Sequence, residues 1–256
     1  MPLSNIEYQY GFGVYESIRV VNGFPYFAGE HIGRMMESAR IIGLAHPFTV
    51  DGVSDSVAKL LEKNGATTCN VKIVLVGGKT SADAALNILC LNPLFPDKKM
   101  YRDGVSVVTC EYERAFPHAK TLNMLQSYLA YRKAKESGAY DALLVALDGC
   151  ITEGTRTNFF AIKGKTLFSP PEENILPGIT RKVVLMVAAQ NGFDVVQKAV
   201  RPADLSEYEG AFLTSTSSGI LPVRSVDDFQ FGTQPAALRE LMQDFDVFIA
   251  ECGGVL

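Results

Sequence analysis

The sequence predicts an α+β protein of two domains, mainly antiparallel in the first. The chain has 256 residues, and at about 150 residues per domain this length favours two modest domains. Strand-like and helix-like segments follow one another without the regular alternation of a parallel βαβ protein. Two prolines in residues 92–97 interrupt the pattern. We therefore expect a linker over residues 92–98, between domains at 1–91 and 99–256.

The first domain is expected to combine a hairpin, two helices and two further strands. A β-rich run leads into an Asn22-Gly23 pair, which is typical of a tight hairpin turn. Apolar residues at helical spacing, each set followed by a glycine, predict the two helices. The predicted strands cover residues 14–21, 25–27, 71–76 and 85–91, and the predicted helices cover 30–42 and 53–64.

The second domain is expected to hold more strands than helices. Its turns are marked by pairs such as Asp148-Gly149 and Asn191-Gly192. The predicted strands cover residues 104–111, 142–147, 150–153, 158–162, 166–168, 195–200 and 211–213, and the predicted helices cover 122–136, 180–190 and 235–242.

Charge and hydropathy exclude two classes of partner. There are 24 Lys and Arg against 28 Asp and Glu, a net charge of −4. A strongly electropositive surface for nucleic acid is therefore not expected, although a local basic pocket is compatible with this balance. The most apolar stretch, residues 183–189, is far shorter than the ~20 residues that cross a bilayer. We therefore expect neither nucleic acid nor a membrane as a partner.

Cysteine and histidine usage points to the cytoplasm and away from metal. The five cysteines are widely spaced and form no Cys-x-x-Cys pair, as in proteins with reduced thiols. The first residues have neither the basic nor the apolar region of an export signal. His31, His46 and His118 are not at metal-ligand spacing. A cytoplasmic protein without a metal site is expected.

Three segments have small or polar residues suited to an anion. Residues 77–80 resemble part of a phosphate loop, but Ile73 stands where that loop needs glycine, so a hairpin turn is favoured. Residues 176–181 place Pro-Gly at the start of an apolar helix, which suits either an anion cradle or plain helix capping. Residues 214–219 suit either a backbone nest for an anion or a solvated turn.

Three charged side chains are candidates for chemistry, each with an ordinary alternative. Glu153 lies between two predicted strands, where it can meet a cationic nitrogen or simply face water. Lys120 lies at the edge between a strand and a helix, where partial desolvation would make its amine nucleophilic. Arg34 lies on a predicted helix and can equally face water. None of these residues decides the function alone.

Taken in order, these segments resemble the class IV aminotransferases, the fold-type IV pyridoxal-phosphate enzymes. Relatives in this family include branched-chain and D-amino-acid aminotransferases and aminodeoxychorismate lyase. The resemblance covers nearly the whole chain and implies a small antiparallel α/β domain followed by a larger, β-barrel-like domain with helices. The matching segments are Tyr10–Arg19, Glu30–Met35 with Ser38–Ala39, Lys120–Asn123, Thr152–Asn158, Leu176–Arg181, and Thr216 with Pro222–Val223.

The resemblance assigns roles around pyridoxal 5'-phosphate. Lys120 matches the lysine that holds the cofactor as a Schiff base, and Glu153 matches the acidic partner of the pyridine nitrogen. A carboxylate there keeps the ring nitrogen protonated, so that the ring accepts electrons from the substrate. The phosphate contacts correspond to Arg34, Ile179 through its N–H, Thr180 and Thr216, and the apolar contact with the ring corresponds to Leu176.

The substrate motifs point in several directions. Branched-chain enzymes tend to carry Tyr-x-Arg where Asn70-Val71-Lys72 stands, and D-amino-acid enzymes carry an Arg-x-His group with no clear match after Gly78. Residues 72–78 look closest to the lyase, whereas residues 15–19 resemble the transferases and residues 222–227 the branched-chain enzymes. The substrate candidates are Tyr10, Tyr15, Lys72 and Ser217.

The prediction is therefore a transaminase that moves an amino group between a small or branched apolar amino acid and a 2-oxo acid by a ping-pong mechanism. The alternatives are a lyase that releases pyruvate, a D-amino-acid aminotransferase, and a non-catalytic phosphate- or cofactor-binding protein. The resemblance also implies a homodimer. Relatives usually carry an extra strand and hairpin before the Tyr10 region, which this chain all but lacks, so we expect its small sheet to protect an edge differently.

Overall fold

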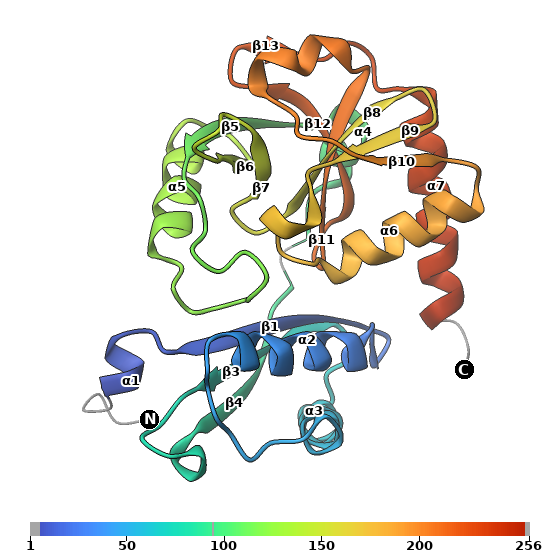
Figure 1. The fold of residues 1–256 in the computed structure, drawn as a ribbon. Coiled ribbons are helices and arrows are strands. Elements are labelled where there is room, and N and C mark those ends of the chain that lie inside the picture. Colours follow the sequence, from blue (N-terminus) through green and yellow to red (C-terminus); the bar gives the residue numbers. More distant parts are fainter. Residues whose placement is uncertain (1–5, 94, 254–256) are drawn as a thin grey trace. The chain divides into compact units, whose positions relative to one another are not determined.

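The computed structural model describes residues 6–93 and 95–253, which form two compact units (Figure 1). The first unit comprises residues 6–93 together with residues 116–124, and the second comprises residues 95–115 and 125–253. The sequence predicts two continuous domains, whereas in the structure the short segment 116–124 belongs to the N-terminal unit. This placement matters below, because the segment contains Lys120.

The first unit is built on a four-stranded antiparallel sheet with the order β2-β1-β3-β4. The hairpin between β1 and β2 turns at Asn22 and Gly23, both with positive φ (53° and 78°), as the tight turn predicted there requires. The strands are β1 (Gly13–Val21), β2 (Phe24–Pro25), β3 (Cys69–Val76) and β4 (Ala85–Leu91).

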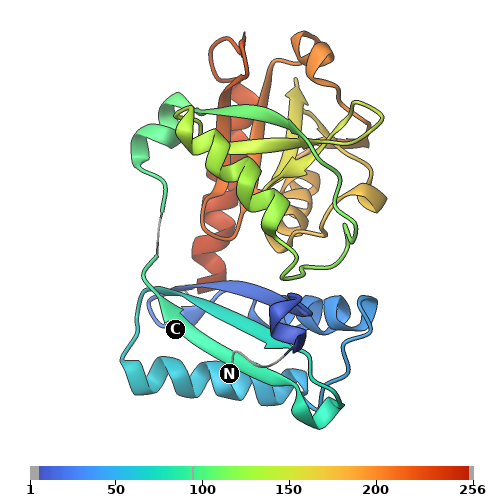
Figure 2. The ribbon, with the colours of Figure 1, turned by 90° about the vertical axis from the view of Figure 1, so that its left-hand side faces the viewer.

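Helices α2 (Ala28–Ile41) and α3 (Val50–Asn64) pack with this sheet, and Figure 2 shows α3 running alongside it. Alternate residues of β1 and β3 share a buried cluster with apolar residues of both helices, and each fully buried aliphatic side chain there contributes ~1.5–3 kcal/mol. Thr49 caps α3 by accepting a hydrogen bond from the N–H of Gly52, and Gly65 ends the helix in the left-handed conformation. A short helix α1 (Ile6–Gln9) precedes the sheet.

The segment 116–124 lies against the N-terminal half of β1. Thr121 forms an antiparallel bridge with Val14, and the N–H of Leu122 donates to the carbonyl of Gly13 at 2.8 Å. Among the residues that the structure describes, strand β2 pairs with β1 at its other end, at Val20 and Val21. The segment therefore hydrogen-bonds to a stretch of β1 that β2 does not reach.

The second unit contains a nine-stranded sheet that closes on itself. The path runs β10-β9-β8-β11-β12-β5-β6-β7, and β7 also pairs with β8. The six strands from β8 round to β7 thus form a ring, which is the barrel-like domain expected from the resemblance. The strands are β5 (Val105–Glu111), β6 (Asp141–Val145), β7 (Ile151–Gly154), β8 (Asn158–Lys163), β9 (Thr166–Ser169), β10 (Asp194–Gln197), β11 (Gly210–Ser215), β12 (Gly219–Val226) and β13 (Phe229–Gln230).

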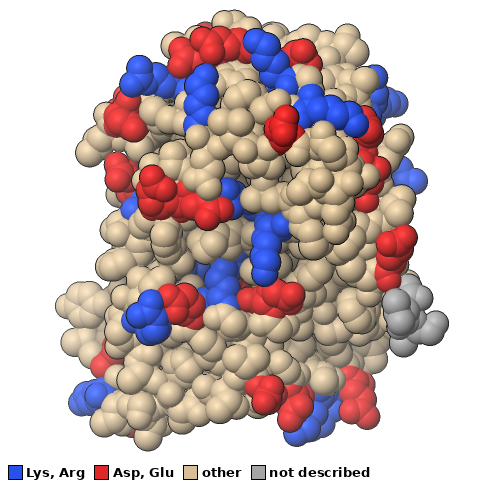
Figure 3. Space-filling view, turned by 45° about the vertical axis from the view of Figure 1, so that its right-hand side comes forward, with Lys and Arg blue, Asp and Glu red and all other residues tan. Residues whose placement is uncertain are grey.

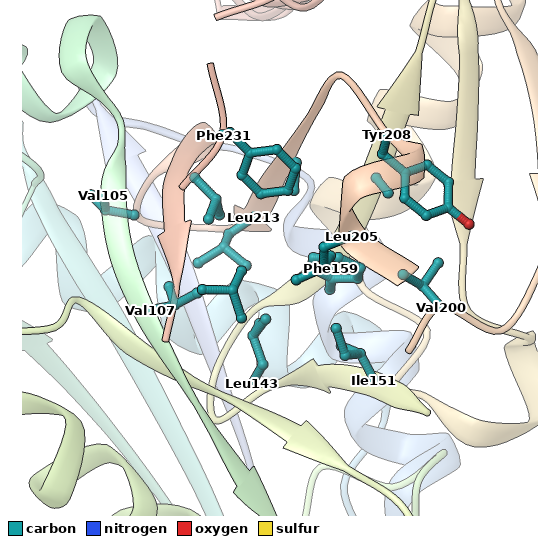
Figure 4. Close-up of a cluster of buried hydrophobic side chains, with 14 of the residues drawn as sticks. Val105, Val107, Leu143, Ile151, Phe159, Val200, Leu205, Tyr208, Leu213 and Phe231 are labelled. Carbon is teal, nitrogen blue, oxygen red and sulfur yellow. The ribbon is translucent and has the colours of Figure 1, made fainter. Parts of the chain in front are cut away.

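The core of this unit is apolar and drawn from strands all round the ring (Figure 4). Phe159, Leu143 and Leu213 are fully buried in it, and Leu205 from a 3₁₀ turn closes one side. The helices of the unit are α4 (Lys98–Asp103), α5 (Leu125–Glu136), α6 (Ile179–Gln190) and α7 (Ala236–Gly253), and the 3₁₀ turns of the chain are η1 (Ser81–Asp83), η2 (Glu172–Asn174) and η3 (Pro202–Glu207).

Several predicted bounds are wrong. Helix α5 begins at Leu125, three residues later than expected, because Thr121 and Leu122 are paired with β1 in the first unit. Helix α7 continues to Gly253, and Phe245 extends its buried side beyond the predicted end at 242. Strand β10 ends at Gln197 rather than at residue 200. Strand β12 and helix α4 were not expected at all.

Three features of the described residues concern membranes, metal ions and surface charge. None of the helices in the described part of the chain is long and apolar enough to span a membrane. Within the same residues, no group of three or more His, Cys, Asp and Glu side chains is arranged to hold a metal ion. On the face drawn in Figure 3, basic and acidic side chains are interspersed.

Candidate active site

Arg34 is held by a buried carboxylate. Its Nε and Nη2 donate to Oε1 and Oε2 of Glu16, at 2.7 and 2.8 Å, and Nδ1 of His31 lies 2.7 Å from Oε2. Glu16 is fully buried on β1, while Arg34 lies on α2 and is partly buried. Burial alone would raise the pKa of Glu16, but Arg34 and His31 lower it to about 2. The two bonds fix the direction of the guanidinium plane.

Lys120 is fixed by its backbone next to this pair. Its N–H donates to Oγ of Ser38 at 3.0 Å, and its carbonyl accepts from the N–H of Tyr15 at 2.9 Å. The Ser38 hydroxyl donates in turn to the carbonyl of Arg34. The structure thus brings together Lys120 and Arg34, which lie far apart in the sequence, through one serine.

Two lysines lie over the ring of Tyr15. Nζ of Lys72 is 3.5 Å from the ring centroid, and Nζ of Lys120 is 4.7 Å from it, both within cation–π range. Partial burial lowers the pKa of Lys72, the charge of Lys120 lowers it further, and Tyr15 opposes the shift. The first unit therefore groups Lys120, Arg34, Tyr15 and Lys72, whereas the Tyr10 side chain is 80% exposed.

Glu153 is the buried carboxylate of the second unit. It lies on β7 and is 4% exposed, so the surface-turn alternative is wrong. Nη1 of Arg114 donates to its Oε1 at 2.8 Å, and the N–H of Leu176 donates to Oε2 at 3.1 Å. A charge-assisted bond and a backbone bond hold the carboxylate in one orientation.

Asn158 connects Glu153 to the other predicted loops. In the sheet it lies opposite Glu153 of β7 on one side and Thr214 of β11 on the other. Its Nδ2 donates to the carbonyl of Leu176 at 2.9 Å and lies 3.5 Å from Oε2 of Glu153. A row across three strands therefore joins the carboxylate, the 176–181 segment and the start of the 214–219 loop.

The 176–181 segment opens helix α6 at Gly178. Within the described residues no side chain caps this helix, so the first N–H groups, which include those of Ile179 and Thr180, are left for an anion. A Cβ on Gly178 would lie 1.9 Å from Oδ1 of Asn158, so only glycine fits this close approach. The capping alternative has no capping side chain in this part of the chain.

The 214–219 segment connects β11 to β12 and is held by its own hydroxyls. The Oγ atoms of Ser215 and Ser218 are 2.7 Å apart, and the N–H of Ser218 donates to Ser215. Thr216 and Ser217 at the turn are partly exposed. Oγ1 of Thr214 is buried without a hydrogen-bond partner among the described residues, which is unusual for a native hydroxyl.

The 77–80 segment is not part of a phosphate loop. Strands β3 and β4 pair antiparallel on either side of it, and Asp83 accepts hydrogen bonds from both the N–H and the hydroxyl of Thr80. The hairpin predicted there is confirmed.

The structure also adds residues that sequence reasoning missed. Glu16, His31 and Arg114 were not singled out, although each contacts a predicted site residue. Glu16 and His31 lie inside the matched segments. A search of those segments for an acid that could pair with Arg34 would have identified Glu16. Arg114 is 39 residues from Glu153, and no local pattern marks it.

The comparisons with known proteins decide the family. The family model for class IV amino-transferases matches residues 13–226. The chain belongs to the class IV aminotransferase family. This aminotransferase is 32% identical to the D-alanine aminotransferase of Bacillus licheniformis over 246 residues, covering 92% of this chain and 87% of the relative. It is 31% identical to a provisionally named branched-chain-amino-acid aminotransferase of Methanocaldococcus jannaschii, with the same coverage.

A solved structure supports the fold of the aminotransferase. The provisionally named 4-amino-4-deoxychorismate lyase of Legionella pneumophila matches with a TM-score of 0.86 at 26% identity, covering 95% of each chain. The two-part α+β fold with a small antiparallel sheet and a larger barrel-like sheet, predicted as fold-type IV, is confirmed.

Enzymes of this family use pyridoxal phosphate, and the residues present fit that group. A buried, oriented carboxylate suits a protonated ring nitrogen. The uncapped start of α6 and the unpartnered Thr214 hydroxyl suit a phosphate close to the 214–219 loop.

Proposed function

We propose that the aminotransferase exchanges an amino group between an amino acid with a small or branched apolar side chain and a 2-oxo acid, in two ping-pong half-reactions. The observation that carries this proposal is the pair of relatives at 31–32% identity over 92% of the chain, one named for D-alanine and one for branched-chain amino acids. Both substrates have small or branched apolar side chains.

Pyridoxal 5'-phosphate is the proposed cofactor, and when bound it supplies an electron sink for the substrate's α-carbon. Lys120 would hold it and then carry the proton to and from the α-carbon as general base. Glu153 would hold a proton at the ring nitrogen, since its carboxylate is buried and kept in place by Arg114 and the N–H of Leu176. The side chain of Leu176 is proposed to pack against the ring.

The phosphate contacts are proposed for Arg34, the N–H of Ile179, and the hydroxyls of Thr180 and Thr216. The support is electrostatic. Glu16 engages Nε and Nη2 of Arg34 and so fixes the direction of a positively charged guanidinium, which attracts a phosphate oxygen. The start of α6 offers backbone N–H groups with the positive end of the helix dipole.

Substrate contacts are proposed for Tyr10, Tyr15, Lys72 and Ser217. Lys72 is the candidate for a carboxylate or a polar side chain. Within the described residues it forms no ion pair with an acid, and it lies over Tyr15 beside Lys120. A carboxylate substrate would supply the missing counter-charge.

A second candidate is the lyase reaction, in which the same lysine and cofactor release pyruvate from aminodeoxychorismate. It is favoured by the structural match to the Legionella protein over 95% of each chain and by the lyase-like strand that carries Lys72. We keep it as the alternative outcome of the experiment below.

We also propose that the enzyme acts as a homodimer in the cytoplasm. Leu125, Tyr128 and Leu129 are exposed together on α5 at spacings that place them on one face of the helix, and a second subunit covering that face would bury them. The five cysteines form no disulfide in the described residues, in keeping with a reducing compartment.

The test is a spectral panel on the protein purified with the cofactor supplied. We expect a yellow protein whose visible band is lost in Lys120→Ala and kept in the control Lys79→Ala, a change at an exposed lysine. L-leucine, L-glutamate and D-alanine are then added separately, and the true amino donor bleaches the band. A colourless wild type would overturn the cofactor assignment. Pyruvate release from aminodeoxychorismate, with no donor bleaching the band, would replace the transaminase with the lyase.

A further inference from the structure

The second unit contains an open cavity that the proposed reaction does not use. Its volume is about 930 Å³, and it is lined by residues of α4, the β12–β13 region and α7. None of the residues proposed above for cofactor or substrate lines it. Its size is that of cavities which hold small organic ligands.

The lining is basic although the chain is acidic overall. Four cationic side chains face two carboxylates, whereas the whole chain carries a net charge of −4. The cations are Lys98, Arg102, Arg224 and Arg239, and the acids are Asp103 and Asp246. Arg102 is paired with Asp103 at 2.7 Å, so most of the positive charge comes from the other three.

In the described residues none of those three cations forms an ion pair, although the pKa of Asp103 is lowered by Arg102 and, more weakly, by Arg224. Nη2 of Arg224 donates to the hydroxyl of Ser106 at 2.9 Å, and Nη1 of Arg239 donates to the carbonyl of Gln234 at 2.5 Å. Both acceptors are neutral, so each bond orients a guanidinium without cancelling its charge. Such cations attract an anion with several oxygens.

The backbone around the cavity is closely packed and therefore preorganised. The carbonyl of Arg224 accepts from the N–H of Phe231 at 2.9 Å. Gly104, with a φ of 72°, packs so closely that a Cβ there would lie 3.0–3.3 Å from atoms of Arg224. The backbone of such a site loses little conformational entropy when a ligand binds.

Apolar side chains also contribute to the lining of the cavity. Tyr101, Phe231 and Met242 contribute to the lining, and the Tyr101 hydroxyl is already donated to the carbonyl of Ser218 at 2.9 Å. Tyr101 and Phe231 also pack with the apolar core of this unit, so a ligand can contact only the parts of these rings that line the cavity. The cavity can therefore accommodate a ligand that carries both an anionic group and a flat ring.

We propose that this cavity binds a phosphorylated small molecule of nucleotide size, at a site separate from the cofactor. Arg224 and Arg239 take the phosphate oxygens, Lys98 adds charge, and the apolar lining residues contact the organic part. The proposal does not depend on the proposed transamination, because it concerns a different cavity.

The test is calorimetric titration of ADP into the cofactor-loaded enzyme, in which the cofactor already fills its own phosphate site. We expect saturable binding to the wild type, weakened about tenfold or more in Arg224→Ala with Arg239→Ala. Lys163→Ala removes one exposed charge from β8, outside the cavity, and should leave the affinity unchanged. Pyrophosphate, which lacks the ring, should bind more weakly than ADP.

Three results would overturn the proposal. They are no heat of binding up to about 5 mM ADP, equal affinity in the wild type and the double variant, and an equal loss in Lys163→Ala. Because both arginines are exposed, the double variant is expected to fold, and its melting curve checks this. Arg224→Lys with Arg239→Lys keeps the charge, and it should retain more of the affinity than the alanine variant.

Discussion

Glu16 and Arg34 form a two-point ion pair in the first unit, with the Arg34 Nε and Nη2 atoms 2.7 and 2.8 Å from the two carboxylate oxygens. Glu16 is fully buried, and its Oε2 also lies within hydrogen-bond distance of Nδ1 of His31. A pair of this kind orients a guanidinium more firmly than a single contact does. It gives Arg34, a candidate for the cofactor phosphate, a fixed direction before any ligand arrives.

Glu16→Gln should lower both stability and cofactor affinity. Removing one partner of a buried pair leaves the other charge uncompensated, which costs ~3–5 kcal/mol. Urea unfolding measures the first effect and fluorescence titration of the apoenzyme measures the second. Glu37→Gln is the matched control, because Glu37 pairs with Arg40 on the exposed side of α2, the helix that carries Arg34. Equal effects of the two changes would contradict the role of Glu16.

The same pair predicts how stability depends on pH. The pKa of Glu16 is lowered from 4.5 to about 2 in the folded protein, so the folded state favours the ionised form. Its contribution is fully present above pH 4.5 and is lost as the pH falls toward 2. Unfolding free energies of wild type and Glu16→Gln should therefore converge between pH 4.5 and 2. Curves that stay parallel over this range would refute the assignment.

Glu153→Gln should retain the cofactor and slow turnover by roughly a hundredfold, because a neutral amide does not hold the proton on the ring nitrogen. The amide occupies nearly the same volume and keeps an oxygen for the Leu176 N–H. Steady-state kinetics with the donor found in the spectral panel measures the effect. Glu173→Gln, at an exposed acid, serves as the control. An unchanged kcat in Glu153→Gln would remove Glu153 from the mechanism.

Gly178→Ala should disturb the start of α6. The added Cβ would lie 1.9 Å from Oδ1 of Asn158, and relieving this overlap costs ~1–3 kcal/mol. We expect lower stability and weaker cofactor binding, since Asn158 also binds the carbonyl of Leu176. Gly29→Ala on α2 is the contrasting change, because nothing lies within 4 Å of its added Cβ. Gly29→Ala should leave the stability unchanged or raise it. If Gly178→Ala also left the stability unchanged, Gly178 would not lie as close to Asn158 as the structure indicates.

Much of the local structure could be predicted because its signals are local. Strand β4 has the predicted bounds, 85–91, and the Asn22-Gly23 turn is where the sequence places it. Strand β12 was missed because Pro222 removes a donor and normally argues against a strand. The structure accommodates it opposite Phe212, next to a register shift between Val223 and Ser225.

The candidate site was predicted through motifs rather than through contacts. Glu153, Arg34 and Lys120 were identified by resemblance, and the structure buries the first and gives all three defined neighbours. The neighbours themselves were not foreseen. Glu16 is 18 residues from Arg34 and Arg114 is 39 from Glu153, and ion pairs at such separations are set by tertiary packing, which no periodicity encodes.

The bridge between Thr121 and Val14 has a consequence for biosynthesis. Because residues 116–124 belong to the first unit, that unit is not complete when residue 93 leaves the ribosome. At ~5–20 residues per second, the nascent chain must grow for a few more seconds before the segment can pair with β1. Until then, the backbone groups of Val14 that later bond to Thr121 are exposed to solvent. Lys120, the lysine proposed for catalysis, lies in the same late segment that completes the hydrogen bonding of β1.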